Sequence, residues 1–210
     1  MRTRIKICGL TREQDVDAAV NAGVDAIGLV FYPPSPRLLS IQRAAKLAAR
    51  IPPFVSTVGL FVNESEGAVK NVLDSVALDV LQFHGEEDEQ YCRSFGRPYV
   101  KAARVRRGLD LLEFARSYSS ASGLLLDAYV DGYGGKGEMF DWSMIPSYLP
   151  LPVIVSGGLR SDNVVAAIQR LQPWAVDVSS GVESGKGIKD AAKIAAFVAA
   201  VKHADSLSVS

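Results

Sequence analysis

The sequence predicts a single-domain (β/α)8 barrel, and three observations support that prediction. Short apolar runs begin about 20 to 30 residues apart along the chain, and several are followed by an amphipathic helical pattern. Alternation of this kind implies a parallel sheet with right-handed crossovers. No glycine-rich nucleotide fingerprint follows the first run, where an open doubly wound sheet would normally carry one. The length of 210 residues fits one domain and lies at the short end for a closed barrel.

The strands are expected at the apolar runs 4–8, 25–31, 54–62, 78–84, 99–102, 123–127, 152–156 and 175–179. A capping-box pattern from Thr11 to Gln14 predicts the start of the first helix, which runs to Asn21 and is stopped by Gly23. The later helices are expected over 40–49, 65–76, 86–93, 109–118, 162–171 and 190–202. The barrel then spans 1–203, and 204–210 is expected to be a frayed polar tail.

Composition excludes several classes of protein. Apolar residues make up 48% of the chain and charged residues 22%, which fits a folded domain with a sizeable core and excludes wholesale disorder. Lys plus Arg and Asp plus Glu both number 23, so the formal net charge is zero. A nucleic-acid-binding or membrane-surface protein would carry a clustered excess of one sign, so neither kind of partner is expected.

The two cysteines, Cys8 and Cys92, cannot form a disulfide framework and lack the spacing of a zinc site. No signal peptide and no apolar stretch long enough to span a membrane are recognisable. A cytoplasmic setting is therefore expected, and no bound metal is expected.

A barrel places its functional groups at the carboxyl ends of the strands. Small residues follow the last two predicted strands: Ser156, Gly157 and Gly158 after the seventh, and Ser179, Ser180 and Gly181 after the eighth. Glycines let the backbone approach an anion closely, and loops seven and eight are the usual phosphate site of this fold. We therefore expect a phosphate group here. A third glycine segment, 132–137, follows the sixth strand and is expected to act as a covering loop.

The end of the first strand is the first catalytic candidate. Lys6 and Cys8 share one strand face and should point into the barrel, because the other face packs on helices. A cation beside a thiol favours the thiolate, which can act as a base, although a lone cysteine is more often simple core packing. Asp177 on the neighbouring eighth strand is expected to neutralise Lys6 in a supporting role.

Asp127 ends the apolar sixth strand and is the second catalytic candidate. A buried carboxyl group holds its proton more readily, which suits a general acid. The first and sixth strands lie well apart around the barrel, so a ligand across the mouth could meet Cys8 on one side and Asp127 on the other. His84 ends the fourth strand and either lines the pocket or bonds a neighbour.

Arg37 follows three prolines in the loop after the second strand, and the stiff loop presents its guanidinium at low entropic cost. The planar fork of that group suits a carboxylate.

Several of these segments occur together in one known family. They are Lys6-Ile7-Cys8-Gly9-Leu10, Ser35-Pro36-Arg37, Val58-Gly59-Leu60-Phe61, Leu81-Gln82-Phe83-His84-Gly85, Phe140-Asp141-Trp142, Ser156-Gly157-Gly158-Leu159 and Asp177-Val178-Ser179-Ser180-Gly181-Val182-Glu183. In this order, covering nearly the whole chain, they resemble phosphoribosylanthranilate isomerase. One departure is Lys136, where the family usually has threonine in its Gly-Gly-Thr-Gly segment.

The resemblance implies a cofactor-free (β/α)8 isomerase of tryptophan biosynthesis, working as a monomer or homodimer on a phosphosugar. The reaction would be the Amadori rearrangement of N-(5-phosphoribosyl)anthranilate to 1-(2-carboxyphenylamino)-1-deoxyribulose 5-phosphate. The family's general base falls on Cys8, its general acid on Asp127 and its carboxylate-binding arginine on Arg37. Its phosphate loops fall on the pair Gly157 and Gly158 and on the segment 179–181.

Two alternatives stay open at this point. Another phosphosugar barrel enzyme is one: indole-glycerol-phosphate synthase needs a lysine and glutamates at strand ends that we do not find, and pentose-phosphate epimerases need more histidines than His84 and His203. A non-catalytic phosphosugar-binding barrel is the other, and it would keep the glycine loops while losing Cys8 or Asp127. A second aminosugar substrate from histidine biosynthesis is compatible with the sequence.

Overall fold

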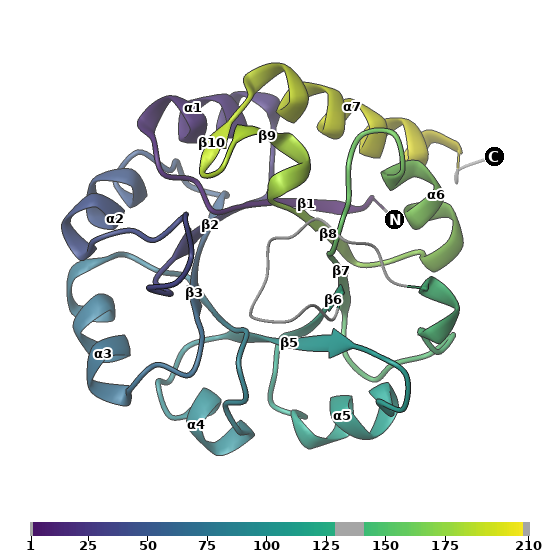
Figure 1. The fold of residues 1–210 in the computed structure, drawn as a ribbon, viewed down its shortest axis with the longest axis horizontal. Helices are drawn as coiled ribbons and strands as arrows, with labels where there is room; N and C mark the ends of the chain where they lie inside the picture. The colour runs from purple at the N-terminus through teal and green to yellow at the C-terminus, as the bar shows by residue number, and fades with distance from the viewer. Residues whose placement is uncertain (1, 129–140, 208–210) are drawn as a thin grey trace.

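The computed structural model describes residues 2–128 and 141–207, and it shows a closed barrel of parallel strands surrounded by helices (Figure 1). The barrel strands are β1 (Arg4–Cys8), β2 (Ala26–Val30), β3 (Ser56–Phe61), β4 (Val80–Phe83), β5 (Tyr99–Val105), β6 (Gly123–Ala128), β7 (Val153–Val155) and β8 (Ala175–Val178). Each strand pairs with the next along the chain, and β8 pairs with β1 to close the ring. The predicted fold is therefore confirmed, with every expected strand in place.

The register of the strands decides which side chains become neighbours. Lys6 on β1 lies directly beside Asp177 on β8, and Cys8 lies beside Gly28 on β2. Arg104 on β5 lies beside Asp127 on β6. Because paired residues project to the same face, each of these pairs shares a side of the barrel wall.

The helices outside the barrel are α1 (Glu13–Ala22), α2 (Ile41–Ala48), α3 (Glu66–Ser75), α4 (Glu89–Arg93), α5 (Leu111–Ser117), α6 (Val164–Leu171) and α7 (Ala191–Leu207), with short 3-10 turns η1 (Trp142–Met144) and η2 (Ser180–Val182). Side chains of Ser40, Ser65, Asp88 and Asp110 accept hydrogen bonds from the first turns of α2 to α5. These caps account for the helix starts.

The capping box predicted at Thr11 is wrong. Arg12 occupies the cap position of α1, without a side-chain capping bond. The Thr11 hydroxyl instead donates to the carbonyl oxygen of Gly187 at 2.6 Å, in a hairpin that the sequence pattern did not predict. That hairpin is formed by β9 (Glu183–Gly185) and β10 (Ile188–Lys189). The predicted stop at Gly23 is confirmed, since Gly23 adopts a left-handed φ of 85°.

The frayed tail predicted from 204 onward is wrong as far as Leu207, because α7 continues to that residue. Ala204 is fully buried, and the carboxylate of Asp205 accepts hydrogen bonds from the main-chain nitrogen of Thr3 at 2.9 Å and from its hydroxyl at 2.7 Å. These contacts tie the last turns of α7 to the start of β1. Residues 208–210 lie outside the described part of the chain.

The main apolar core lies between the strands and the ring of helices. Ile5 and Ile7 of β1 are buried in it, whereas the intervening Lys6 turns to the inner side and bonds Asp177. This alternation confirms the predicted orientation of Lys6 and Cys8. Within the residues described, there is no helix with the length and apolar character that a membrane span requires.

Candidate active site

The carboxyl ends of β1 and β8 hold a buried group of charges. Lys6 Nζ donates to Asp177 Oδ1 at 2.8 Å, and both side chains are buried. Cys8 is the last residue of β1 and faces the same interior. Gly28 leaves room for its sulfur, because a Cβ there would lie 2.8 Å from Cys8 Sγ. The sequence-predicted association of Cys8, Lys6 and Asp177 is therefore present.

Burial raises the pKa of the Cys8 thiol above its ordinary value. The positive charges of Lys6 and Lys189 act in the opposite direction, and the carboxylate of Asp177 adds to the effect of burial. The predicted effect of Lys6 is present, because its charge favours the thiolate, but burial acts more strongly in the other direction. Desolvation of the buried thiolate is the largest influence on this pKa, and the nearby cations offset part of it.

The opposite side of the mouth is built around Asp127 at the end of β6. Its Oδ1 accepts from the main-chain nitrogen of Ala128 at 2.9 Å, and its Oδ2 lies 3.1 Å from His84 Nε2. His84 Nδ1 lies 3.0 Å from the side-chain nitrogen of Gln82. The His84 ring lies between the Gln82 amide and the Asp127 carboxyl group, with one ring nitrogen facing each. His84 thus meets the candidate acid directly, a contact that the sequence left undecided.

Arg37 is buried, and a carboxylate of this chain already holds it. Its Nε and Nη2 donate to the two carboxylate oxygens of Glu183 at 2.7 and 2.8 Å. Its aliphatic part lies against Gly9, where a Cβ would come within 2.3 Å of Arg37 Cδ. Sequence reasoning predicted Arg37 and missed Glu183, because the latter follows β8 by a turn whose path the strand pattern does not define.

The glycine turns after β7 and β8 pack against each other. Gly157 and Gly158 have φ values of 81° and 64°, which favour glycine. A Cβ on Gly181 would lie 1.9 Å from the carbonyl oxygen of Leu159, so the β8 turn can approach the β7 turn only without a side chain. Ser179 Oγ donates to the carbonyl oxygen of Cys8 at 3.0 Å, which ties this turn to β1. Residues 156–158 and 179–181 of the two turns are partly exposed.

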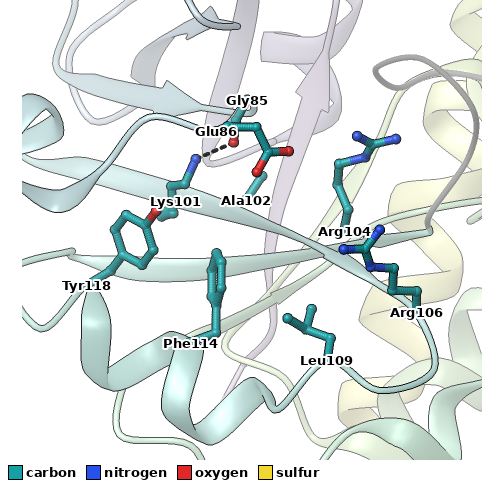
Figure 2. A pocket seen from close by; sticks show the side chains of 9 residues that line it. All are labelled: Gly85, Glu86, Lys101, Ala102, Arg104, Arg106, Leu109, Phe114 and Tyr118. Carbon is teal, nitrogen blue, oxygen red and sulfur yellow. Dashed lines mark hydrogen bonds between the residues drawn. The ribbon is translucent and has the colours of Figure 1, made fainter.

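A cavity of about 230 Å³ lies between β5 and α5. Figure 2 shows Arg104 and Arg106 along one side of it and the rings of Phe114 and Tyr118 along the other. Arg104 adjoins the candidate acid through the β5–β6 register. Sequence reasoning missed it, although its position near the end of the fifth strand was a usable signal.

The predicted covering loop at 132–137, including Lys136, lies outside the described residues. Within 2–128 and 141–207, no group of three or more His, Cys, Asp or Glu side chains is placed to hold a metal ion.

Comparison with known proteins relates this geometry to a family. Residues 5–200 match the family model described as N-(5'-phosphoribosyl)anthranilate isomerase. The protein of that name from Dechloromonas aromatica is 65% identical over 205 residues, covering 98% of this chain and 99% of its own. The chain belongs to the N-(5'-phosphoribosyl)anthranilate isomerase family.

Solved structures of the family agree with the barrel. The phosphoribosylanthranilate isomerase from Thermotoga maritima has a TM-score of 0.88 at 40% identity, covering 96% of this chain and 99% of its own. A second isomerase structure, in complex with reduced 1-(o-carboxyphenylamino)-1-deoxyribulose 5-phosphate, has a TM-score of 0.85 at 38% identity, with the same coverage of both chains. The predictions of a phosphoribosylanthranilate isomerase family member, of an isomerase enzyme and of a role in tryptophan biosynthesis are confirmed, and the two alternatives are not supported.

Proposed function

We propose that this isomerase rearranges N-(5-phosphoribosyl)anthranilate by general acid–base catalysis, with Asp127 as the acid and Cys8 as the base. The order of the strands is the observation that carries the proposal. Between β6, which ends in the acid region, and β1, which ends in Cys8, lie β7 and β8 with their glycine turns. A phosphosugar whose phosphate rests on those turns would extend its carbon chain into the space between acid and base.

The chemistry follows from those positions. Asp127 donates a proton to the ring oxygen of the aminosugar, and the ring opens to a protonated Schiff base. The Cys8 thiolate then takes the proton from C2′, which gives an enolamine. The enolamine becomes the ketone as C1′ gains a proton, so the product is an isomer of the substrate and no electrons leave the molecule. A well-placed acid or base each contributes roughly 10²–10⁴ in rate.

Arg37 is proposed to hold the carboxylate of the anthranilate ring. The bonds to Glu183 use Nε and one Nη2 hydrogen, and a guanidinium carries further N–H donors at Nη1. Glu183 and the stiff loop fix the guanidinium before substrate arrives, which lowers the entropic cost of binding.

The phosphate is proposed to bind at Gly157, Gly158, Ser179, Ser180 and Gly181. Positive φ angles at the first two and the partial exposure of both turns support this assignment. Binding energy at the phosphate would orient the sugar between Cys8 and Asp127.

The decisive experiment follows the fluorescence of phosphoribosylanthranilate in the presence of the purified chain. We expect a protein-dependent loss of substrate fluorescence together with formation of the ketose product. If the chain bound the reduced product analogue in the same sample but left the substrate unchanged, it would be a binding protein and the proposal would fail.

The setting and assembly are also proposed. A base that must stay a free thiol fits the reducing cytoplasm. A monomer or a homodimer is proposed, because one matched structure shows monomers of the dimeric enzyme from Thermotoga maritima. Light scattering at several protein concentrations distinguishes the two.

A further inference from the structure

Lys189 has no assigned role, yet it lies at the centre of the charges beside Cys8. The β9–β10 hairpin carries it back over the end of β8, and its side chain is completely buried. Its Nζ donates to Glu183 Oε1 at 2.8 Å and to the carbonyl oxygen of Ser179 at 3.0 Å, with the Ser179 hydroxyl 3.3 Å away. Burial of a lysine without solvent contact is costly, so a residue in this position has a specific reason to be charged.

Glu183 connects Lys189 to the substrate-binding arginine. The same Oε1 atom accepts from Lys189 Nζ and from Arg37 Nε. Two cations therefore share one carboxylate, and the three groups carry a net charge of +1. The second ion pair at this side, Lys6 with Asp177, carries a net charge of zero.

Charged groups from four segments of the chain act on Cys8. They are Lys6 on β1, Asp177 on β8, Lys189 on β10 and Arg37 after β2. Together with Glu183 these groups have a net charge of +1 when Cys8 is a thiol and zero when it is a thiolate. A buried cluster is most stable when its charges balance, so the surplus cation favours the thiolate that the proposed reaction requires.

We propose that Lys189 is a positioning residue that stabilises the thiolate form of Cys8 and holds Glu183 in the orientation that fixes Arg37. This inference rests on the proposed roles of Cys8 and Arg37. Burial lowers the pKa of Lys189, while the charges of Glu183 and Cys8 act to raise it. Lys189 in turn acts to lower the pKa of Cys8.

The test compares the pH dependence of kcat/KM for wild type, Lys189→Met and Lys189→Arg. Removing the charge disfavours the thiolate, so we expect the acidic limb to move to higher pH by about one unit in Lys189→Met, roughly tenfold in thiolate population at a fixed pH. Lys189→Arg keeps the positive charge, so its acidic limb should lie close to that of the wild type. Lys193→Met is the matched control. Lys193 lies on the surface and its Nζ donates to the main-chain oxygen of Glu183 at 2.7 Å. The acidic limb of the Lys193→Met profile should stay where it is in the wild type.

Glu183→Gln gives an effect of opposite sign that a purely structural role would not produce. It leaves the cluster with a surplus of two positive charges, so the acidic limb should move to lower pH while KM rises through the loosened Arg37. If Lys189→Met and Glu183→Gln shifted the limb in the same direction, or if Lys189→Met left it in place, the inference would be overturned.

A second measurement is independent of turnover. Titration of thiolate absorbance, taken as the difference between each protein and its Cys8→Ser counterpart, should give a higher pKa for Cys8 in Lys189→Met than in wild type. An equal pKa refutes the inference. Full activity of Cys8→Ser would instead refute the proposed function, so the two failures are distinguishable. Circular dichroism confirms that each variant is folded.

Discussion

Buried ion pairs gather around Cys8, whereas on the other side of the barrel a chain of hydrogen bonds leads to Asp127, with Arg104 beside it in the strand register. On the β1–β8 side, Lys6, Lys189 and Arg37 are buried and paired with Asp177 and Glu183. On the β4–β6 side, a chain of hydrogen bonds runs from Gln82 through His84 to Asp127.

The difference corresponds to what each side has to do in the proposed reaction. A base on a buried thiol needs compensating charge, because desolvation disfavours its anion. An acid needs its carboxyl group held in one orientation, which hydrogen bonds provide without added charge. Variants on the two sides should therefore fail in different ways.

Loss of either catalytic group should have the largest effect. Cys8→Ser and Asp127→Asn are each expected to reduce kcat by about 10²–10⁴. The melting temperature should change little, since both replacements are close in shape. Steady-state fluorescence kinetics measure the effect, and near-normal turnover in either variant would remove the corresponding role.

Removing one partner from a buried ion pair should have the second largest effect. Asp177→Asn leaves Lys6 without its carboxylate, and Glu87→Gln does the same to Lys101, whose Nζ lies 2.8 Å from Glu87 Oε2. Breaking a buried pair costs about 3–5 kcal/mol of stability, so both variants should unfold at lower denaturant concentration.

Activity separates these two variants. Asp177 acts to raise the pKa of Cys8, so Asp177→Asn should move the acidic limb of the kcat/KM profile to lower pH, whereas Glu87→Gln should leave that limb in place. An acidic limb that stays in place in both variants would show that the charge of Asp177 has no effect on Cys8.

The hydrogen bond from His84 to Asp127 should matter less than the carboxyl group itself. A hydrogen bond between neutral groups contributes about 0.5–1.5 kcal/mol, so His84→Ala should lower kcat by up to about tenfold. The acidic limb set by Cys8 should stay in place. A shift of that limb would show that the two sides are coupled.

Replacing the guanidinium of Arg37 by an ammonium group is expected to affect substrate binding more than turnover. Arg37→Lys keeps the charge but loses the paired bonds to Glu183, so KM should rise by about tenfold with a smaller change in kcat. Initial-rate kinetics over a range of substrate concentrations measure the split. Unchanged KM and kcat would exclude Arg37 from the site.

The smallest effect concerns acid stability. Burial acts to raise the pKa of Glu183, but hydrogen bonds and charges from Arg37 and Lys189 lower it below its ordinary value of 4.5. A lowered pKa contributes stability above the ordinary value, and that contribution is lost as pH falls through the folded pKa. The melting temperature of wild type should therefore fall below pH 4.5 more steeply than that of Glu183→Gln.

The surface residue Glu66, paired with Lys70 on α3, provides the control. Glu66→Gln should follow the wild-type curve in the same melting experiment. If it flattened the curve as much as Glu183→Gln, the buried pair would not be the cause.

The sequence by itself determined the barrel, because the patterns that predict strands and helices are local and can be read from one sequence. It also determined that Cys8 and Asp127 end strands, and strand ends meet at one mouth in this fold. Its local signals failed at Thr11 and at 204–207, where contacts with the hairpin and with β1 replaced the expected cap and tail.

Only the tertiary structure decided how the charges are shared. Lys189 and Arg37 are far apart in sequence, and no periodicity shows that one carboxylate holds both. The direction of the pKa shift of Cys8 likewise could not be predicted from the sequence, because a neighbouring lysine and burial act in opposite directions. Their balance depends on distances and desolvation that exist only once the chain is folded.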